Sequence, residues 1–310
     1  MSHPLGARPA RLTIGLVGAG RAGTVIAAAL ARVGHRVVAA SAVSEASRAR
    51  AAELIPQARI ADPVSVASEC DLLIVAVPDD VLPDLVAGLS ATGAIRAGQI
   101  VVHLSGRHGI DVLAPATAVG ASCLALHPAM TLTGAAYEVD RLDGCPFAVS
   151  SVDALRPVAE ALVLEMGGEP EWIAEDQRML YHAALCHASN HLVTLVAQSQ
   201  DLLAAAGIAA PDRFLAPLLS ATLDNALRSG DAALTGPVAR GDAGTISGHL
   251  ETIAECAASP SGSSIATTYA ALAHATAIRA HAVGRITAAQ TDSVLDAVER
   301  FTGTSAGGTR

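Results

Sequence analysis

A short glycine-rich segment near the start of the chain constrains its fold more than any other feature. Residues 12–17 form an apolar run typical of a buried strand, Gly18, Gly20 and Gly23 follow with the spacing G-x-G-x-x-G, and residues 24–32 favour a helix. Strand, glycine turn and helix in this order are typical of a unit that binds a dinucleotide. The segment therefore predicts a Rossmann-like fold, although a glycine turn that binds no ligand is the alternative.

The residues of this turn have separate expected roles. Gly18 would make the tight turn, Gly20 would let the backbone approach a pyrophosphate, and Gly23 would let the helix pack closely on the strand. Arg21 and Ala22 lie inside the turn. With the glycines, they would place the pyrophosphate at the positive end of the helix.

The first half of the chain repeats the pattern of a strand followed by a helix. Apolar runs predict further strands at residues 36–40, 71–77, 100–104, 122–126, 146–150 and 170–173. Helices are expected between them, for example at residues 81–89 and 153–166. This alternation predicts an α/β fold with a doubly wound, mostly parallel sheet.

Ligands of such sheets bind beyond the carboxyl ends of the strands. We therefore expect three strand ends to rim one cleft. They are Val77, Pro78 and Asp79, residues 103–106, which include Ser105, and residues 126–130, which include His127.

The end of the second strand carries information about the cofactor. NAD sites usually place an acidic residue there, about 20 residues beyond the glycines. Here the strand leads into Ser41 and Ser44, while Glu45 comes late and is followed by Arg48 and Arg50. Hydroxyls and an arginine suit the 2′-phosphate of NADP(H), so NADP(H) is the expected cofactor. Alternatively, Arg48 is a solvated arginine at the start of a helix.

The second half of the chain has a different sequence pattern. From residue 175, strand-like runs give way to alanine-rich helical stretches at residues 176–206, 211–229, 242–257, 264–283 and 287–301. We predict a Rossmann-like domain over residues 10–174 and an all-helical domain over residues 175–303. The helical domain is expected to bind substrate and to form a homodimer.

The first of these helices carries a polar stripe. At 3.6 residues per turn, His182, Cys186, Ser189 and Val193 share one face, with Asn190 at its edge. A histidine can donate a proton near neutral pH, and an asparagine amide can orient a carbonyl. A half-buried structural histidine is the alternative for His182.

A loop further along suits a small anionic substrate. Residues 234–239 precede Arg240 and Gly241, and Asp242 is the predicted N-cap of the next helix. A helix start with an arginine can hold a carboxylate, so Arg240, Asp242 and Ser189 are predicted substrate contacts. Alternatively, the loop is simply capped and Arg240 forms a structural ion pair.

Composition excludes several classes of function. The net charge is −9 and there is no basic run, which argues against nucleic acid and anionic membranes as partners. No apolar stretch reaches the roughly 18 residues of a membrane span, and residues 1–9 lack the apolar core of a signal peptide, so we expect a cytoplasmic protein. All twenty Lys and Arg residues are arginine, so any proton donor must be another residue type.

No metal site is expected. The five cysteines are widely spaced and form no C-x-x-C pair, which favours isolated thiols. His187 and His191 are one helical turn apart, but no third ligand accompanies them.

Together these motifs resemble one family. They are the glycine turn with its arginine, residues 103–106, His127-Pro128, residues 181–190 and residues 235–242. The resemblance covers roughly residues 11–300 and is to proteins in which a Rossmann-like domain precedes a helical domain of unknown function. These lie within the 6-phosphogluconate dehydrogenase-like superfamily. Some members act as alternative ketopantoate reductases, which implies reduction of 2-dehydropantoate to pantoate by NADPH in pantothenate and coenzyme A biosynthesis.

The resemblance also implies catalytic roles. Conventional ketopantoate reductases use a lysine four residues before an asparagine; here Asn190 matches the asparagine, but Cys186 stands at the lysine position. We hypothesise that His182, one turn earlier, donates the proton while Asn190 orients the substrate oxygen. His127 and Ser105 are second candidates.

Two other functions stay open. The loop at residues 235–242 is similar to the substrate loop of pyrroline-5-carboxylate reductases, which implies reduction of a cyclic imine instead. A protein that binds NADP without catalysis, as a regulator or scaffold, is the alternative from another class, because polar helix faces also form dimer interfaces.

Overall fold

The computed structural model describes residues 11–256 and 260–306. Residues 1–9, to which the expectation about a signal peptide applies, lie outside this part. The chain forms two compact units, which divide between Asn190 and His191. This division falls further along than the change in composition at residue 175, because the first turns of a long helix pack with the sheet.

The first unit is built on one eight-stranded sheet with the order β3-β2-β1-β4-β5-β6-β7-β8. All neighbouring strands are parallel except β6 and β7, which confirms the doubly wound, mostly parallel sheet. The strands are β1 (Thr13–Val17), β2 (Arg36–Ser41), β3 (Arg59–Ile60), β4 (Leu72–Val75), β5 (Ile100–His103), β6 (Ser122–Pro128), β7 (Pro146–Ser151) and β8 (Glu169–Trp172).

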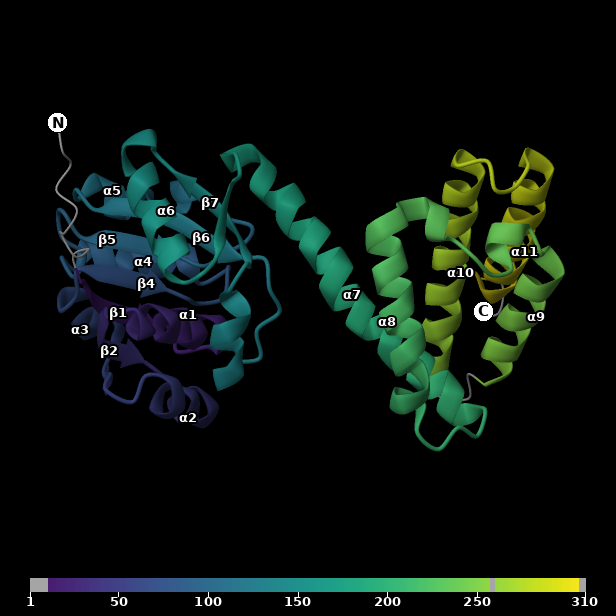
Figure 1. Ribbon diagram of the computed structural model, residues 1–310, viewed down its shortest axis with the longest axis horizontal. Coiled ribbons are helices and arrows are strands. Elements are labelled where there is room, and N and C mark those ends of the chain that lie inside the picture. Colours follow the sequence, from purple (N-terminus) through teal and green to yellow (C-terminus); the bar gives the residue numbers. More distant parts are fainter. Residues whose placement is uncertain (1–10, 257–259, 307–310) are drawn as a thin grey trace, which may run out of the picture. The chain divides into compact units, whose positions relative to one another are not determined.

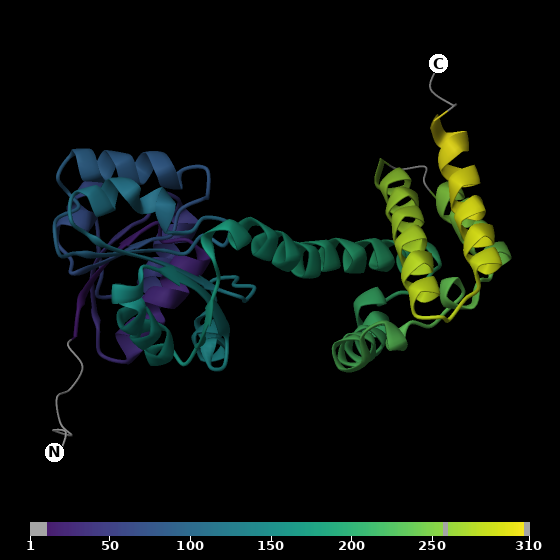
Figure 2. The same ribbon diagram turned by 90° about the horizontal axis from the view of Figure 1, so that it is seen from above.

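Helices cover both faces of this sheet, as Figures 1 and 2 show. One layer contains α1 (Arg21–Arg32), α2 (Glu45–Leu54) and α6 (Arg156–Glu165). The other contains α3 (Pro63–Ser68), α4 (Leu82–Ala91) and α5 (Ala114–Ala118). Because both faces are covered, the central strands are apolar throughout, and all four residues of β4 are buried.

Helix α7 (Arg178–Ala205) starts in the first unit and ends in the second. The second unit continues with α8 (Pro211–Ser229), α9 (Ala243–Glu255), α10 (Pro260–Ala282) and α11 (Ala288–Ala306). Its core lies between α9, α10 and α11, around residues such as Ile246, Leu250 and Val294. The predicted all-helical second half is therefore confirmed. No helix among the described residues is both long and apolar enough to cross a membrane.

A buried arginine fastens the start of α7 to the sheet. The Arg178 side chain is fully buried, and its Nε and terminal nitrogens donate hydrogen bonds of 2.9–3.3 Å. The acceptors are the Ser150 hydroxyl and the carbonyls of Ser105, Ala125 and Ala148. Because these acceptors lie on β6, on β7 and just beyond β5, one side chain fixes α7 against the ends of three strands.

Replacing Arg178 by methionine should lower the free energy of unfolding of the first unit by about 3 kcal/mol, because four acceptors lose their donor in the protein interior. Urea unfolding followed by the fluorescence of Trp172, the single tryptophan, measures this unit.

Arg32→Met is the matched control for this variant. Arg32 forms an exposed ion pair with Asp140, so its loss should cost less than about 1 kcal/mol. Equal losses in the two variants would contradict the anchoring role of Arg178.

Candidate functional site

The glycine turn has the conformation that a dinucleotide site requires. Gly18 has a φ of +94°, and a Cβ there would collide with the Ala76 carbonyl oxygen. A Cβ at Gly23 would lie 2.6 Å from the Gly18 carbonyl oxygen, so close packing of α1 on β1 requires a glycine there. The tight turn and the close packing predicted for Gly18 and Gly23 are both present.

Gly20 differs from the other two glycines. A Cβ at Gly20 would meet no protein atom nearer than 3.9 Å, so packing within the chain does not require a glycine. Gly20 is also the N-cap of α1, has no capping side chain, and is followed by a first turn without an acidic residue. Open space beside uncapped amide groups at a helix start fits a pyrophosphate.

The two serines at the end of β2 bond within the protein. Ser41 is buried, and its hydroxyl accepts a hydrogen bond from the Gly18 amide at 3.0 Å. Ser44 caps α2 by accepting from the Ser47 amide at 3.1 Å. No acidic residue stands at the end of β2, where Ala42 and Val43 separate the two serines. Ser41 supports the glycine turn, so a 2′-phosphate would have to be bound mainly by nearby arginines.

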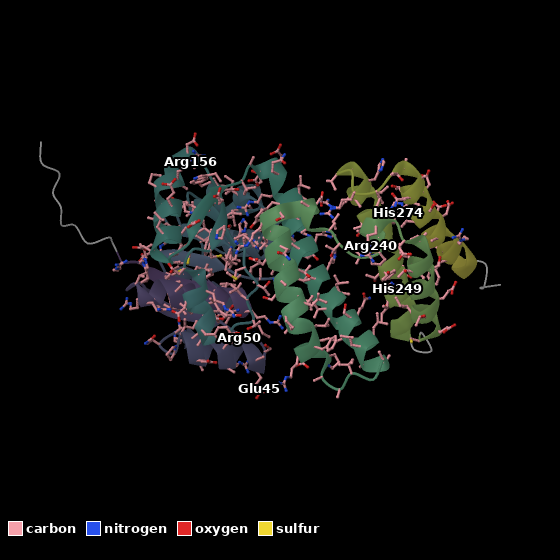
Figure 3. The ribbon with its side chains drawn as sticks, turned by 45° about the vertical axis from the view of Figure 1, so that its right-hand side comes forward. Glu45, Arg50, Arg156, Arg240, His249 and His274 are labelled. Carbon is pink, nitrogen blue, oxygen red and sulfur yellow. The ribbon has the colours of Figure 1, made fainter. Side chains whose placement is uncertain are left out.

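Two arginines lie on α2, and one of them has an unusual environment. Arg48 is exposed, whereas the Nε of Arg50 is buried without a hydrogen-bond partner. Arg50 packs under Gly134, where a Cβ would lie 2.5 Å from Arg50 Cδ and 3.3 Å from Arg21 Cα. Arg50, labelled in Figure 3, therefore lies beside the start of α1. Sequence reasoning did not select Arg50, because its environment depends on a loop more than eighty positions away.

The strand ends predicted to rim a cleft adjoin one another. Val77 contacts the position of Gly18, and Arg107 lies 3.9 Å from the Asp79 carboxylate. Gly106 follows β5 and approaches the imidazole rings beyond β6, since a Cβ there would lie 2.9 Å from His127 Nε2.

The hydroxyl and the amide of Ser105 both form hydrogen bonds within the protein. Its hydroxyl accepts a hydrogen bond from the His108 amide at 3.1 Å, and its amide donates to His103 Nδ1 at 3.1 Å. Burial lowers the pKa of His103 to about 3, so this ring is neutral, and its Nε2 donates to the Gly109 carbonyl at 2.7 Å. Ser105 and His103 shape the loop that brings Gly106 to the site.

A cavity of about 370 Å³ lies within the first unit, between the end of β6 and the first half of α7. This volume suits a small ligand. Four of the predicted site residues line it together: His127, His182, Ser189 and Asn190. The helical periodicity that placed His182, Cys186 and Asn190 on one side of α7 is confirmed.

His127 and Tyr181 form a hydrogen-bonded pair in this site. His127 Nδ1 and the Tyr181 hydroxyl are 2.8 Å apart. Burial lowers the pKa of His127 to about 4, with further lowering from His182 and Arg178, and burial raises the pKa of Tyr181 to about 12. Near pH 7 the imidazole is neutral and the phenol protonated. When Tyr181 donates, the His127 proton lies on Nε2, near Gly106.

His182 stands beside this pair. The rings of His127 and His182 are 6.0 Å apart, edge to face, and His182 Nε2 lies 3.5 Å from Cys186 Sγ. A Cβ at Gly106 would lie 2.7 Å from His182 Cδ2, so the absence of a side chain there lets the two rings converge. Tyr181 is the first residue of the motif at residues 181–190, and its role as the hydrogen-bond partner of His127 is visible only in the structure.

The predicted substrate residues of the second loop belong to the second unit. Asp242 is the N-cap of α9, as predicted, and accepts hydrogen bonds from the Thr245 amide at 3.2 Å and the Thr245 hydroxyl at 2.7 Å. These bonds lower the pKa of Asp242. Arg240 is exposed and forms no ion pair within the described part of the chain.

Two family models match the chain. Residues 2–128 match a Rossmann-like domain, and residues 145–276 match a domain of unknown function, DUF2520. The chain joins a Rossmann-like domain to a DUF2520 domain. This confirms the resemblance inferred from the motifs. The DUF2520 match begins at β7, so it includes the last strands of the sheet and Arg178. A search of the curated proteins found no match.

Several solved structures share the fold. A Bacteroides fragilis protein assigned as an NADP oxidoreductase has a TM-score of 0.73 and 21% identity, over 86% of this chain and 98% of that one. A reductive aminase from Aspergillus terreus, solved with NADPH and ethyl levulinate, has a TM-score of 0.56 and 18% identity over 97% of both chains. An imine reductase from Streptomyces aurantiacus has a TM-score of 0.55 and 20% identity over 95% of both chains. At these identities the likeness is one of fold.

Metal ligands are not gathered in either unit. Within residues 11–256 and 260–306, no group of three or more His, Cys, Asp or Glu side chains is placed to hold an ion.

The stability of the first unit should decrease between pH 7 and pH 5. The pKa of His127 is about 4 in the folded state and 6.5 in the unfolded chain, so the unfolded state binds more protons in this interval. The contribution of His127 is complete well above pH 6.5 and is lost as the pH falls below this value, by about 2 kcal/mol at pH 5. His103, whose pKa is about 3, adds to the loss.

Urea unfolding at both pH values, followed by Trp172 fluorescence, measures this loss. His127→Gln should remove about 2 kcal/mol of the pH dependence. His274→Gln is the control, because that histidine is exposed on α10. A His127→Gln protein with the wild-type pH dependence would show the assignment to be wrong.

Proposed function

We propose that the protein is an NADPH-dependent reductase of a small 2-oxo acid, and that its substrate is 2-dehydropantoate, which it converts to pantoate for pantothenate and coenzyme A biosynthesis. The observation that carries the proposal is the cavity in which His182 and Asn190 meet His127. It offers a proton donor and an amide to a reacting carbonyl in a chain that has no lysine. The choice of 2-dehydropantoate rests on the resemblance of the motifs.

The glycine turn and the arginines of α2 fit NADPH. The open space at Gly20 and the start of α1 would accept the pyrophosphate, and Arg48 and Arg50 would hold the 2′-phosphate. The buried, unpartnered Nε of Arg50 supports this, because an anion would satisfy its donor. When bound, NADPH supplies the hydride. The B. fragilis protein and the reductive aminase support the same cofactor through their fold.

The protein residues would manage the proton and the orientation of the substrate. Asn190 donates to the carbonyl oxygen and turns the carbonyl carbon towards the cofactor. His182 donates a proton to that oxygen as the alkoxide forms. The neutral His127, held by Tyr181, presents a second donor to the same space. Arg240, exposed and without an ion pair in the described chain, is the proposed partner of the substrate carboxylate.

Reduction of an imine is the second candidate. The S. aurantiacus imine reductase and the A. terreus reductive aminase have this fold, and the loop before α9 resembles that of pyrroline-5-carboxylate reductases. The polar cavity favours the oxo acid, because the carbonyl oxygen needs a proton when hydride adds to the carbonyl carbon.

Oxidation of NADPH with 2-dehydropantoate and with pyrroline-5-carboxylate tests both candidates. Turnover with 2-dehydropantoate and a much lower rate with the imine is the expected result. The reverse result would establish the imine reductase. No turnover with either substrate, together with tight NADPH binding, would instead support a regulator or scaffold.

His182→Gln should lower kcat for 2-dehydropantoate by about 10²–10⁴-fold while changing KM little, because the general acid acts mainly in the transition state. Steady-state kinetics at saturating NADPH measures both constants. His187→Gln is the control on the same helix, since His187 does not line the cavity. A kcat close to the wild-type value would remove His182 from this role.

Arg50→Met and Arg48→Met should each raise KM for NADPH by about 10–100-fold, because each variant loses a charged donor to the 2′-phosphate. KM for NADH should change little. Arg36→Met, at the opposite end of β2, is the control. A variant that weakens NADPH and NADH equally would contradict a contact with the 2′-phosphate.

We also propose that the protein is a homodimer formed through the helical domain. Helix α8 supports this, because Leu215 is its only buried residue, while Phe214, Leu218 and Leu227 are 58%, 61% and 80% exposed. Large apolar side chains exposed along a helix support its burial against a partner. Sedimentation equilibrium of the purified protein should give twice the chain mass, and a monomer at micromolar concentration would overturn the proposal.

A further inference from the structure

A second cavity lies wholly within the helical unit. It has a volume of about 460 Å³ and lies between the second half of α7, the loop and start of α9, and one face of α10. The α10 residues that line it recur at helical spacing, from Ile265 through Tyr269 and Leu272 to Thr276. Its size is within the range of small-molecule sites.

The polar wall of this cavity contains a hydrogen-bonded pair from two helices. His249 Nδ1 on α9 and the Tyr269 hydroxyl on α10 are 2.7 Å apart, and their rings meet edge to face. Burial raises the pKa of Tyr269, so the phenol stays protonated. Figure 3 labels His249 on the same unit as Arg240. The pair joins the two helices and lines the cavity at the same time.

Further polar groups at this wall have hydrogen-bonding atoms that could bind a ligand. Within the described residues, His249 Nε2 makes no hydrogen bond, and the hydroxyls of Thr235 and Thr276 make none. All three residues line the cavity. Polar groups that converge on one cavity without partners are the arrangement by which a pocket orients a ligand.

The α7 wall is mixed, because Leu195 and Leu202 alternate there with Gln198 and Ser199. Leu272 of α10 adds a third large aliphatic side chain. No Asp, Glu or Arg is among the residues that line the cavity. The lining therefore offers no acidic or guanidinium counter-ion to a charged group, whereas an uncharged polar group could bond to His249 and Tyr269.

We propose that this cavity is a binding site for an uncharged hydroxyl or carbonyl group carried on a short, branched aliphatic body. The polar head bonds to His249 and Tyr269, and the aliphatic body packs on the leucines of α7 and α10. The site lies in the helical unit, and its lining includes Thr235, Pro237 and Val238 of the loop before α9. Binding there is measured apart from the proposed reductase activity.

The experiment uses the full-length protein with ¹⁵N-labelled histidine and the probe 2,2-dimethylpropane-1,3-diol, which combines hydroxyl heads with a branched body. The ring signals of His249, assigned by their loss in His249→Gln, should move saturably during the titration. Ethane-1,2-diol, which has the hydroxyls but no aliphatic body, should bind at least tenfold more weakly, because it leaves the leucines uncovered.

Two variants test the two halves of the site. Tyr269→Phe removes one hydrogen bond and should weaken binding of the probe about fivefold to tenfold. Leu272→Trp fills the cavity and should abolish the shifts. His274→Gln, exposed on α10 and absent from the lining, should bind like the wild type. Thermal unfolding of each variant checks that it is folded.

Three results would overturn the inference. The first is that the His249 signals do not respond to the probe, as expected if a second copy of the chain fills the cavity. The second is an equal response to the two diols, and the third is a folded Leu272→Trp variant that binds the probe like the wild type. Turnover of 2-dehydropantoate is measured separately, so the titration of the His249 signals can be interpreted even if the reductase proposal fails.

Discussion

The site depends on a single buried cation. Arg178 carries its charge into the interior and bonds there to one hydroxyl and three carbonyls, all of them neutral. A buried charge without this set of acceptors would be strongly destabilising, so the geometry of the strand ends and the start of α7 must be satisfied together. The residues that line the cavity follow from this, because α7 leaves the sheet at a fixed position and its next turns bring Tyr181, His182 and Asn190 beyond the end of β6.

The same charge contributes to the protonation state of the neighbouring ring. Burial is the main reason that the pKa of His127 falls to about 4, and Arg178 adds to it. Tyr181 then bonds to a neutral imidazole, and both groups keep fixed protonation states across the neutral range. A site with His127 and Tyr181 fixed in this way offers hydrogen bonds of constant direction to a ligand.

Much of this arrangement could be predicted from the sequence, for identifiable reasons. The long apolar strands and the periodicity of α7 are local signals, so the sheet, the helical half and the shared face of His182 and Asn190 followed directly. Elements as short as β3 and α3 carry too few residues for periodicity to identify them. The roles of Ser41, Arg50 and Arg178 depend on partners distant in sequence. A hydroxyl at a strand end fits a phosphate or a glycine turn equally well until the Gly18 amide is seen beside it.

The buried arginine also gives a physical reason for a histidine at position 182. Arg178 and His182 are one helical turn apart on α7, so a permanently charged side chain at position 182 would form a like-charge pair beside a buried cation. An imidazole avoids this like-charge pair whenever it is neutral. The permanent charge of Arg178 thus serves the fold, and the proton donor that we propose beside it is a residue type without a permanent charge.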